Sequence, residues 1–211
     1  PRMTVDHEIR VLPGLAGVRR RPAMYLAPGE VTAAGLLDTA LRTIVSDLAE
    51  PTPSRACVLT PPFAVELGLW TDGVVSVHLH GVTLRLDDPY ASRAWPEPRL
   101  YEALLRMQVP DPGVTWILPI LNALSERLEV TTRHGAKAYR ATCAVGGLIG
   151  LLHEVDPGEL LGDTVLAFRP DTTVVPGELS AEACQTTAKA RTHPTVPVTF
   201  VDHRPARAVA W

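Results

Sequence analysis

The stretch Pro112–Phe168 decides the fold of this chain. It contains TWILPILNALSERLEVTTRHGAKAYRATCAV (residues 115–145) and GDTVLAF (residues 162–168). Apolar residues recur at helical spacing in the first part, at Trp116, Ile117, Ile120, Leu121 and Leu124. Alternating segments at 127–132 and 137–145 flank a His-Gly-Ala turn signal and predict a β-hairpin. Residues 162–168 predict a third strand that returns beside it.

The strongest helix signal follows Thr32, a good N-cap residue, and ends before Pro51. Its apolar stripe comprises Leu36, Leu37, Ala40, Leu41, Ile44, Val45 and Leu48. Weaker patterns predict strands at 57–60, 64–70, 74–80 and 197–201, a short helix near 100–107 and a helix at 181–190. Helices and strands mix without strict βα alternation. This predicts an α/β (α+β) fold, a two-layer sandwich with helices on one face of a mixed β-sheet.

Composition narrows the class of protein. The 211 residues, 46% of them hydrophobic, predict a single globular domain over residues 1–211. The net charge of -3 gives no reason to expect direct nucleic-acid binding. Three widely spaced cysteines (Cys57, Cys143 and Cys184) fit a reducing compartment better than a disulfide framework. No apolar run reaches the ~18 residues of a membrane helix, and no signal peptide is recognisable, so we expect a cytoplasmic protein.

The order of elements, with Asn122-Ala123-Leu124-Ser125 and Asp163-Thr164 in their places, resembles the N-terminal GHKL ATPase domain of DNA gyrase B and topoisomerase IV. Val18–Leu26 (VRRRPAMYL) is similar to the Arg-Lys-Arg-Pro-Gly-Met-Tyr-Ile-Gly segment of that family. Gly35-Leu36 opens a helix at the expected distance. Pro197–Arg204 (PVTFVDHR) is similar to the family's last strand.

The resemblance covers roughly residues 8–205 and implies the architecture predicted above. It also implies that residues 1–13 form an N-terminal arm that reaches a second polypeptide, either a gyrase-type subunit or a second copy in a homodimer. The sequence stops where the family's transducer domain begins, so we expect that domain to be missing. Functional members bind ATP with Mg²⁺.

The helix that carries the family's catalytic groups departs from the family pattern. Aligned by its apolar stripe, it places Arg42 at the position of the water-activating Glu and Ser46 at that of the magnesium-binding Asn. A guanidinium stays protonated at accessible pH and cannot act as a general base. Glu50 lies two turns beyond the required position. We therefore predict no catalytic residue in this helix.

The segments that bind nucleotide in the family are altered in the same way. The adenine-binding Asp-x-Gly-x-Gly becomes Leu79-His80-Gly81-Val82-Thr83, so Leu79 replaces the carboxylate and Gly81 is the one glycine retained. Before the Asn-Ala-Leu-Ser helix, the glycine-rich lid is reduced to Gly113, and Trp116 stands where the phosphates need room. Thr164 matches the family's threonine near adenine, and it equally fits an ordinary strand threonine.

Together these changes predict that ATP hydrolysis is lost, that no metal or cofactor is needed, and that the chain is a pseudoenzyme used as a binding or regulatory module. ATP with Mg²⁺ is the disfavoured ligand, and weak nucleotide binding without turnover is one alternative. A second alternative is a repurposed pocket, in which Leu79 and Trp116 line a cavity for an apolar small molecule and Arg42 holds its acid group. His78 and His80 share one strand face and could supply two metal ligands, but surface histidines beside a turn explain them better.

Overall fold

The sheet has seven strands in the order β5-β4-β3-β6-β2-β1-β7. In this computed structural model, residues 14–27, 30–51, 56–86, 99–107 and 114–204 are described. The strands are β1 (Cys57–Leu69), β2 (Val75–Leu84), β3 (Ser125–His134), β4 (Lys137–Ala144), β5 (Gly147–Val155), β6 (Thr164–Pro170) and β7 (Val198–Asp202). The β1–β7 pair is parallel and the other pairs are antiparallel, so the sheet is mixed as predicted.

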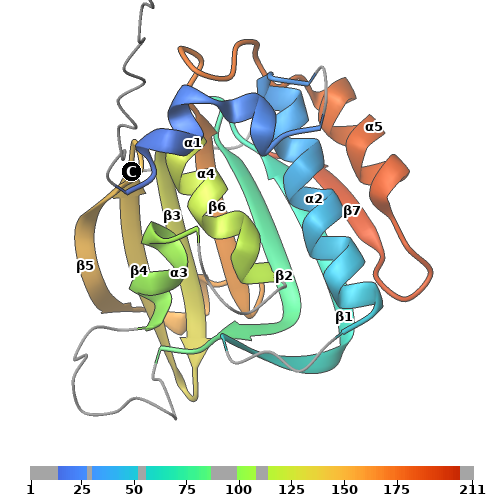
Figure 1. The fold of residues 1–211 in the computed structure, drawn as a ribbon. Helices are drawn as coiled ribbons and strands as arrows, with labels where there is room; N and C mark the ends of the chain where they lie inside the picture. The colour runs from blue at the N-terminus through green and yellow to red at the C-terminus, as the bar shows by residue number, and fades with distance from the viewer. Residues whose placement is uncertain (1–13, 28–29, 52–55, 87–98, 108–113, 205–211) are drawn as a thin grey trace, which may run out of the picture.

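The helices lie on one face of the sheet (Figure 1), which confirms the predicted two-layer arrangement. They are α1 (Ala16–Arg20), α2 (Ala33–Ala49), α3 (Arg99–Leu105), α4 (Leu118–Leu124) and α5 (Ala181–Arg191), with 3-10 turns η1 (Pro22–Met24), η2 (Val114–Ile117) and η3 (Pro157–Glu159). The N-terminal arm at residues 1–13 lies outside the described residues. The sequence also predicts loops at 87–98 and 109–115; residues 87–98 and 109–113 lie outside the described ranges, whereas residues 114–115 belong to η2. No helix in the described ranges is long and apolar enough to cross a membrane.

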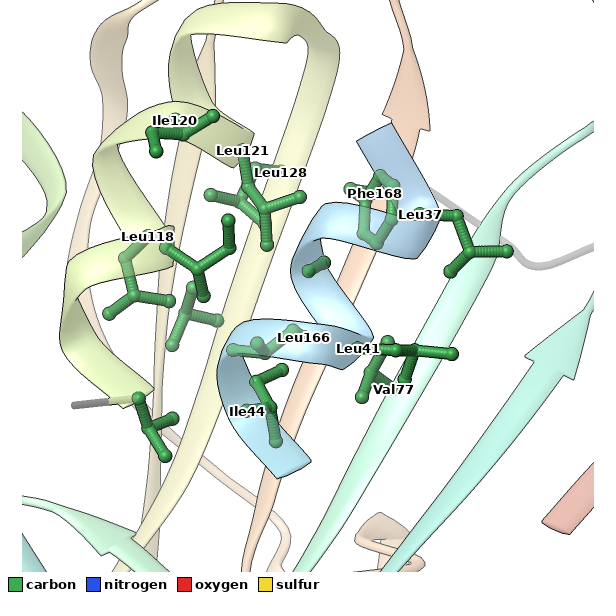
Figure 2. Close-up of a cluster of buried hydrophobic side chains, with 14 of the residues drawn as sticks. Leu37, Leu41, Ile44, Val77, Leu118, Ile120, Leu121, Leu128, Leu166 and Phe168 are labelled. Atoms are coloured by element: carbon green, nitrogen blue, oxygen red, sulfur yellow. The ribbon is translucent and has the colours of Figure 1, made fainter. Parts of the chain in front are cut away.

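The core forms where α2 and α4 press their apolar stripes against the sheet. The Thr32 side chain accepts a hydrogen bond from the Gly35 N–H and caps α2, as predicted. Figure 2 shows side chains of α2 and α4 over those of β2, β3 and β6. The labelled residues are Leu37, Leu41, Ile44, Val77, Leu118, Ile120, Leu121, Leu128, Leu166 and Phe168, and all are fully buried. Burial of each such side chain contributes about 1.5–3 kcal/mol before entropy is counted.

The structure differs from the sequence prediction at two elements. Residues 147–155 form the edge strand β5, which the alternation pattern missed because glycines interrupt its apolar residues. The predicted helical stripe begins too early, since Trp116 belongs to η2 and is 37% exposed. The regular helix starts at Leu118 with Pro119 in its first turn, where the missing N–H has no helical partner to lose.

Arg19 joins three parts of the chain. Its guanidinium donates to the Ala123 carbonyl at 2.7 Å and to the Asp171 carboxylate at 2.6 Å. Burial alone would raise the pKa of Asp171, but hydrogen bonds from Thr173 and Arg19 outweigh this and hold the pKa below its ordinary value. From sequence alone, the basic run Arg19-Arg20-Arg21 is best interpreted as a solvated turn. This interpretation fits the exposed Arg20 and is wrong for Arg19.

Replacing Arg19 by Met should lower the free energy of unfolding by about 1–3 kcal/mol, because the buried Asp171 carboxylate and the Ala123 carbonyl lose their donor. Urea unfolding at neutral pH measures the change. The folded pKa of Asp171 is lowered, so the loss should shrink as pH falls below the carboxyl's ordinary pKa. Arg20→Met is the matched control and should leave stability within about 0.5 kcal/mol of the parent. Equal effects of both variants would contradict the proposed role of Arg19.

Candidate functional site

The floor of the expected nucleotide pocket is formed by two neighbouring strands. Leu79 of β2 pairs directly with Thr164 of β6, so the structure brings these two predicted site residues together. Both residues have 0% exposure, so neither presents surface to a ligand in this conformation. Leu79 carries no acceptor for an adenine amino group, and its side chain belongs to the main apolar core.

The Thr164 hydroxyl is engaged within the protein. It donates to the Val82 carbonyl at 2.7 Å and lies 2.8 Å from the Thr132 hydroxyl. The Thr132 oxygen in turn accepts the Leu84 N–H at 2.9 Å. Since Thr164 gives its proton to Val82, it receives the proton of Thr132. This buried chain stabilises the junction of three strands, which is the ordinary structural role left open for Thr164 by the sequence.

Gly81 serves the local backbone. Its φ is +77°, and an added Cβ would lie 2.4 Å from the Thr60 carbonyl oxygen, so only glycine fits there. The Gly81 N–H donates to the Asp163 carboxylate at 2.7 Å. A donor that a ligand could have used is therefore occupied by a side chain of the segment that leads into β6.

The segment before α4 packs onto α2 instead of leaving room beside it. The Val114 N–H donates to the Asp47 carboxylate at 2.8 Å, and Val114 and Ile117 have 0% exposure. Trp116 stays partly exposed, so the predicted filling of the phosphate space by its indole is not what closes this region. Gly113 lies outside the described residues.

The three predicted positions on α2 face a different part of the molecule. Arg42, Ser46 and Glu50 are exposed and line a shallow groove of about 380 Å³ between α2 and the end of α5. The other lining residues are Val45, Ala49, Ala190, Arg191, Thr192 and His193. Arg191 makes a bidentate pair with Asp38 at 2.7 Å, which holds the two helices together. The structure therefore separates the α2 positions from the buried floor at Leu79 and Thr164.

Within the part of the chain that is described, these residues offer few groups that could bind a nucleotide or hydrolyse it. The carboxylate on the α2 groove belongs to Glu50, away from the floor. No cluster of three or more His, Cys, Asp or Glu side chains suited to a metal ion occurs within the described ranges. The Gly81 N–H and the Thr164 hydroxyl at the floor already have partners inside the protein.

Comparison with known proteins supports the architecture. No family model and no curated protein matches this sequence. Among solved structures, the 43K ATPase domain of Thermus thermophilus gyrase B, determined in complex with an aminocoumarin, superposes with a TM-score of 0.68. The match covers 94% of this chain at 22% identity. The chain has the GHKL ATPase fold.

The chain spans only 51% of the length of the Thermus thermophilus structure. At this level of identity the match establishes the GHKL fold and leaves activity and ligands to be argued from the residues themselves. The predicted resemblance to gyrase B is thereby confirmed at the level of fold.

One polar cluster of this domain was missed by sequence reasoning. On the helix-free face of the sheet, the Trp70 indole N–H donates to the Ser76 hydroxyl at 2.9 Å, and Ser76 lies 2.8 Å from His78 Nε2. His203 stacks on Trp70 with ring centroids 4.1 Å apart. His78 has only 3% exposure, so the prediction of a surface histidine is wrong for it. The i, i+2 spacing of Ser76 and His78 was the available signal.

Burial lowers the pKa of His78 below its ordinary value. The Glu66 carboxylate opposes this shift, while the nearby His203 and His80 reinforce it. His78 Nδ1 has no hydrogen-bond partner among the described residues. An imidazolium at this place would bury a charge that Glu66 offsets only in part, so the folded state favours the neutral ring.

His78 should therefore make folding sensitive to mild acid. Below the ordinary histidine pKa of about 6.5 the unfolded chain binds a proton that the folded chain excludes, so stability falls as pH drops from 7 to 5.5. Urea unfolding at both pH values should show a smaller loss for His78→Gln than for the parent. His134→Gln, on the exposed β3–β4 turn, is the control and should keep the parent's pH dependence. An unchanged loss in His78→Gln would contradict this account.

Proposed function

We propose that this chain is a homologue of gyrase-B-type ATPase domains that has lost ATP hydrolysis and acts as a binding or regulatory module. The observation that carries the proposal is the closed floor, where Leu79 and Thr164 are completely buried. The three free cysteines are also buried, which suits a reducing compartment, and we extend the proposal to a cytoplasmic location.

Admitting a nucleotide base would require the floor to open. Leu79, Val114 and Ile117 would have to leave the core, at about 1.5–3 kcal/mol for each side chain exposed. The base would then meet an aliphatic side chain where an amino group needs an acceptor, a further cost of about 1–3 kcal/mol. These terms together oppose ordinary nucleotide affinity.

The hydrolytic groups are also misplaced for turnover. Arg42 cannot take a proton from water, and Ser46 and Glu50 share its outward-facing groove. Even a weakly bound nucleotide would therefore lack an activated nucleophile. This favours a binding role over a slow enzyme.

The surface around η1 carries family-like residues that are exposed. Arg20 and Arg21 are exposed and make no ion pair with the described residues. Met24 is 68% exposed beside them. A partner with an acidic and apolar surface would complement this segment, and a gyrase-type subunit or a second copy reached through the N-terminal arm is the partner we propose.

Isothermal titration with ATP and Mg²⁺, and with a nonhydrolysable analogue, tests the loss of activity. We expect no binding heat up to millimolar nucleotide and no phosphate release. An active gyrase B ATPase domain, measured in the same buffer, serves as the positive control. Micromolar binding with turnover would end the proposal, whereas binding without turnover would support the alternative of a nucleotide binder that has lost hydrolysis.

A second candidate function rests on the groove between α2 and α5. Arg42 makes no ion pair with the described residues, and the apolar Val45 and Ala49 lie beside it in the groove. This arrangement suits a small amphipathic molecule with an acid group, and it lies elsewhere than the cavity expected at Leu79. Thermal shift with short fatty acids and with adenine nucleotides tests it. Stabilisation by the acids that disappears in Arg42→Ala would support this function, and no shift would dismiss it.

A further inference from the structure

The edge strand β5 pairs irregularly with β4 and carries exposed apolar side chains. Its pairing with β4 breaks twice, between Arg140 and Thr142 and again between Thr142 and Cys143. Each break leaves one extra residue on β5, so the strand carries two bulges. Figure 1 shows β5 at the side of the sheet far from α2 and α5.

Large aliphatic side chains point outward from this bulged hairpin. Leu151 is 75% exposed, Ile149 is 62% exposed, and Val145 in the preceding turn is 52% exposed. We call these three residues the β5 patch. Exposed aliphatic side chains are usual one at a time, but three within seven residues of one hairpin indicate a contact surface.

The backbone of β5 already has hydrogen-bond partners beside the β5 patch. The Leu152 N–H donates to the Tyr101 hydroxyl, and the His153 ring lies within hydrogen-bond distance of the Leu151 carbonyl, at 3.0 Å. These contacts use the peptide group that an added strand would need. A partner would therefore meet side chains of the β5 patch and would not extend the sheet by backbone pairing.

The order of residues in the strand indicates which partner fits. Leu148-Ile149-Gly150-Leu151-Leu152 is symmetric in hydropathy about Gly150, and residues 145–152 include no charged side chain. A twofold axis near Gly150 places Ile149 of one copy against Leu151 of the other, twice, with no like charges opposed. Interfaces between identical chains need this kind of self-complementarity.

We infer that the chain forms a twofold dimer through the β5 patch, with a second copy as the occupant. The three side chains make a patch smaller than the surface buried by specific, stable interfaces, which is about 1,200–2,000 Å² in total. The dimer is therefore weak and reversible, with a dissociation constant on the order of 100 μM. This inference does not depend on whether the domain binds nucleotide.

Sedimentation equilibrium of the full chain from about 10 μM to 1 mM is the test. We expect concentration-dependent dimerisation that Leu151→Lys weakens at least about tenfold. Leu161→Lys is the matched control, because its side chain is 56% exposed outside the β5 patch, and it should dimerise like the parent. Circular dichroism and urea unfolding confirm that every variant is folded.

A second measurement does not rely on loss of function. Oxidation of an equimolar mixture of the Ile149→Cys and Leu151→Cys variants with copper phenanthroline should give a covalent dimer, because the twofold axis places residue 149 of one copy against residue 151 of the other. A mixture of the Ile149→Cys and Leu161→Cys variants should not. The native thiols should stay silent, because all three are buried and burial raises the pKa of Cys143 to about 12 and that of Cys184 to about 11. A parent that is monomeric at 1 mM, a dimer that survives Leu151→Lys, or a dimer lost equally in Leu161→Lys would each overturn the inference.

Discussion

The packing of α2 on the sheet is the constraint on which the rest of the structure depends. Leu37, Leu41 and Ile44 cover β2 and β6, and this contact fixes the rotation of the helix about its own axis. Since neighbouring helical residues point about 100° apart, fixing the apolar face also fixes where Arg42 and Ser46 point. They point into the groove beside α5, and no local rearrangement of side chains could return them to the floor.

The closed floor follows from the same packing. In a fold that places a nucleotide between a helix and a sheet, the space must be kept open by polar groups that only a ligand satisfies. In this chain, polar groups at the predicted pocket positions and beside them bond within the protein: Thr164 with Val82, Gly81 with Asp163, and Val114 with Asp47. Because these groups already have partners within the protein, burying them leaves no hydrogen bond unsatisfied. Apolar side chains can then fill the space at low energy.

The sequence was informative wherever periodicity decides structure. The stripe of α2, the β3–β4 hairpin and the capping by Thr32 were predictable because each depends on residues close in the chain. The edge strand β5 was not, because glycines and two bulges disrupt its alternation. Burial of His78 could not be predicted either, since it depends on residues brought together by tertiary packing and not on its neighbours in the chain. The groove beside Arg42 needed the position of α5, which local patterns do not supply.

Because His203 stacks on Trp70, the fluorescence of Trp70 is sensitive to the position of the last strand, β7. His203 follows β7, its N–H donates to the Leu69 carbonyl at 2.8 Å, and its ring lies against the indole. Detachment of β7 from β1 would remove His203 from the Trp70 indole and change its emission, whereas Trp116 lies in η2. The pairing of β7 with β1 can thus be followed by tryptophan fluorescence, without any added label.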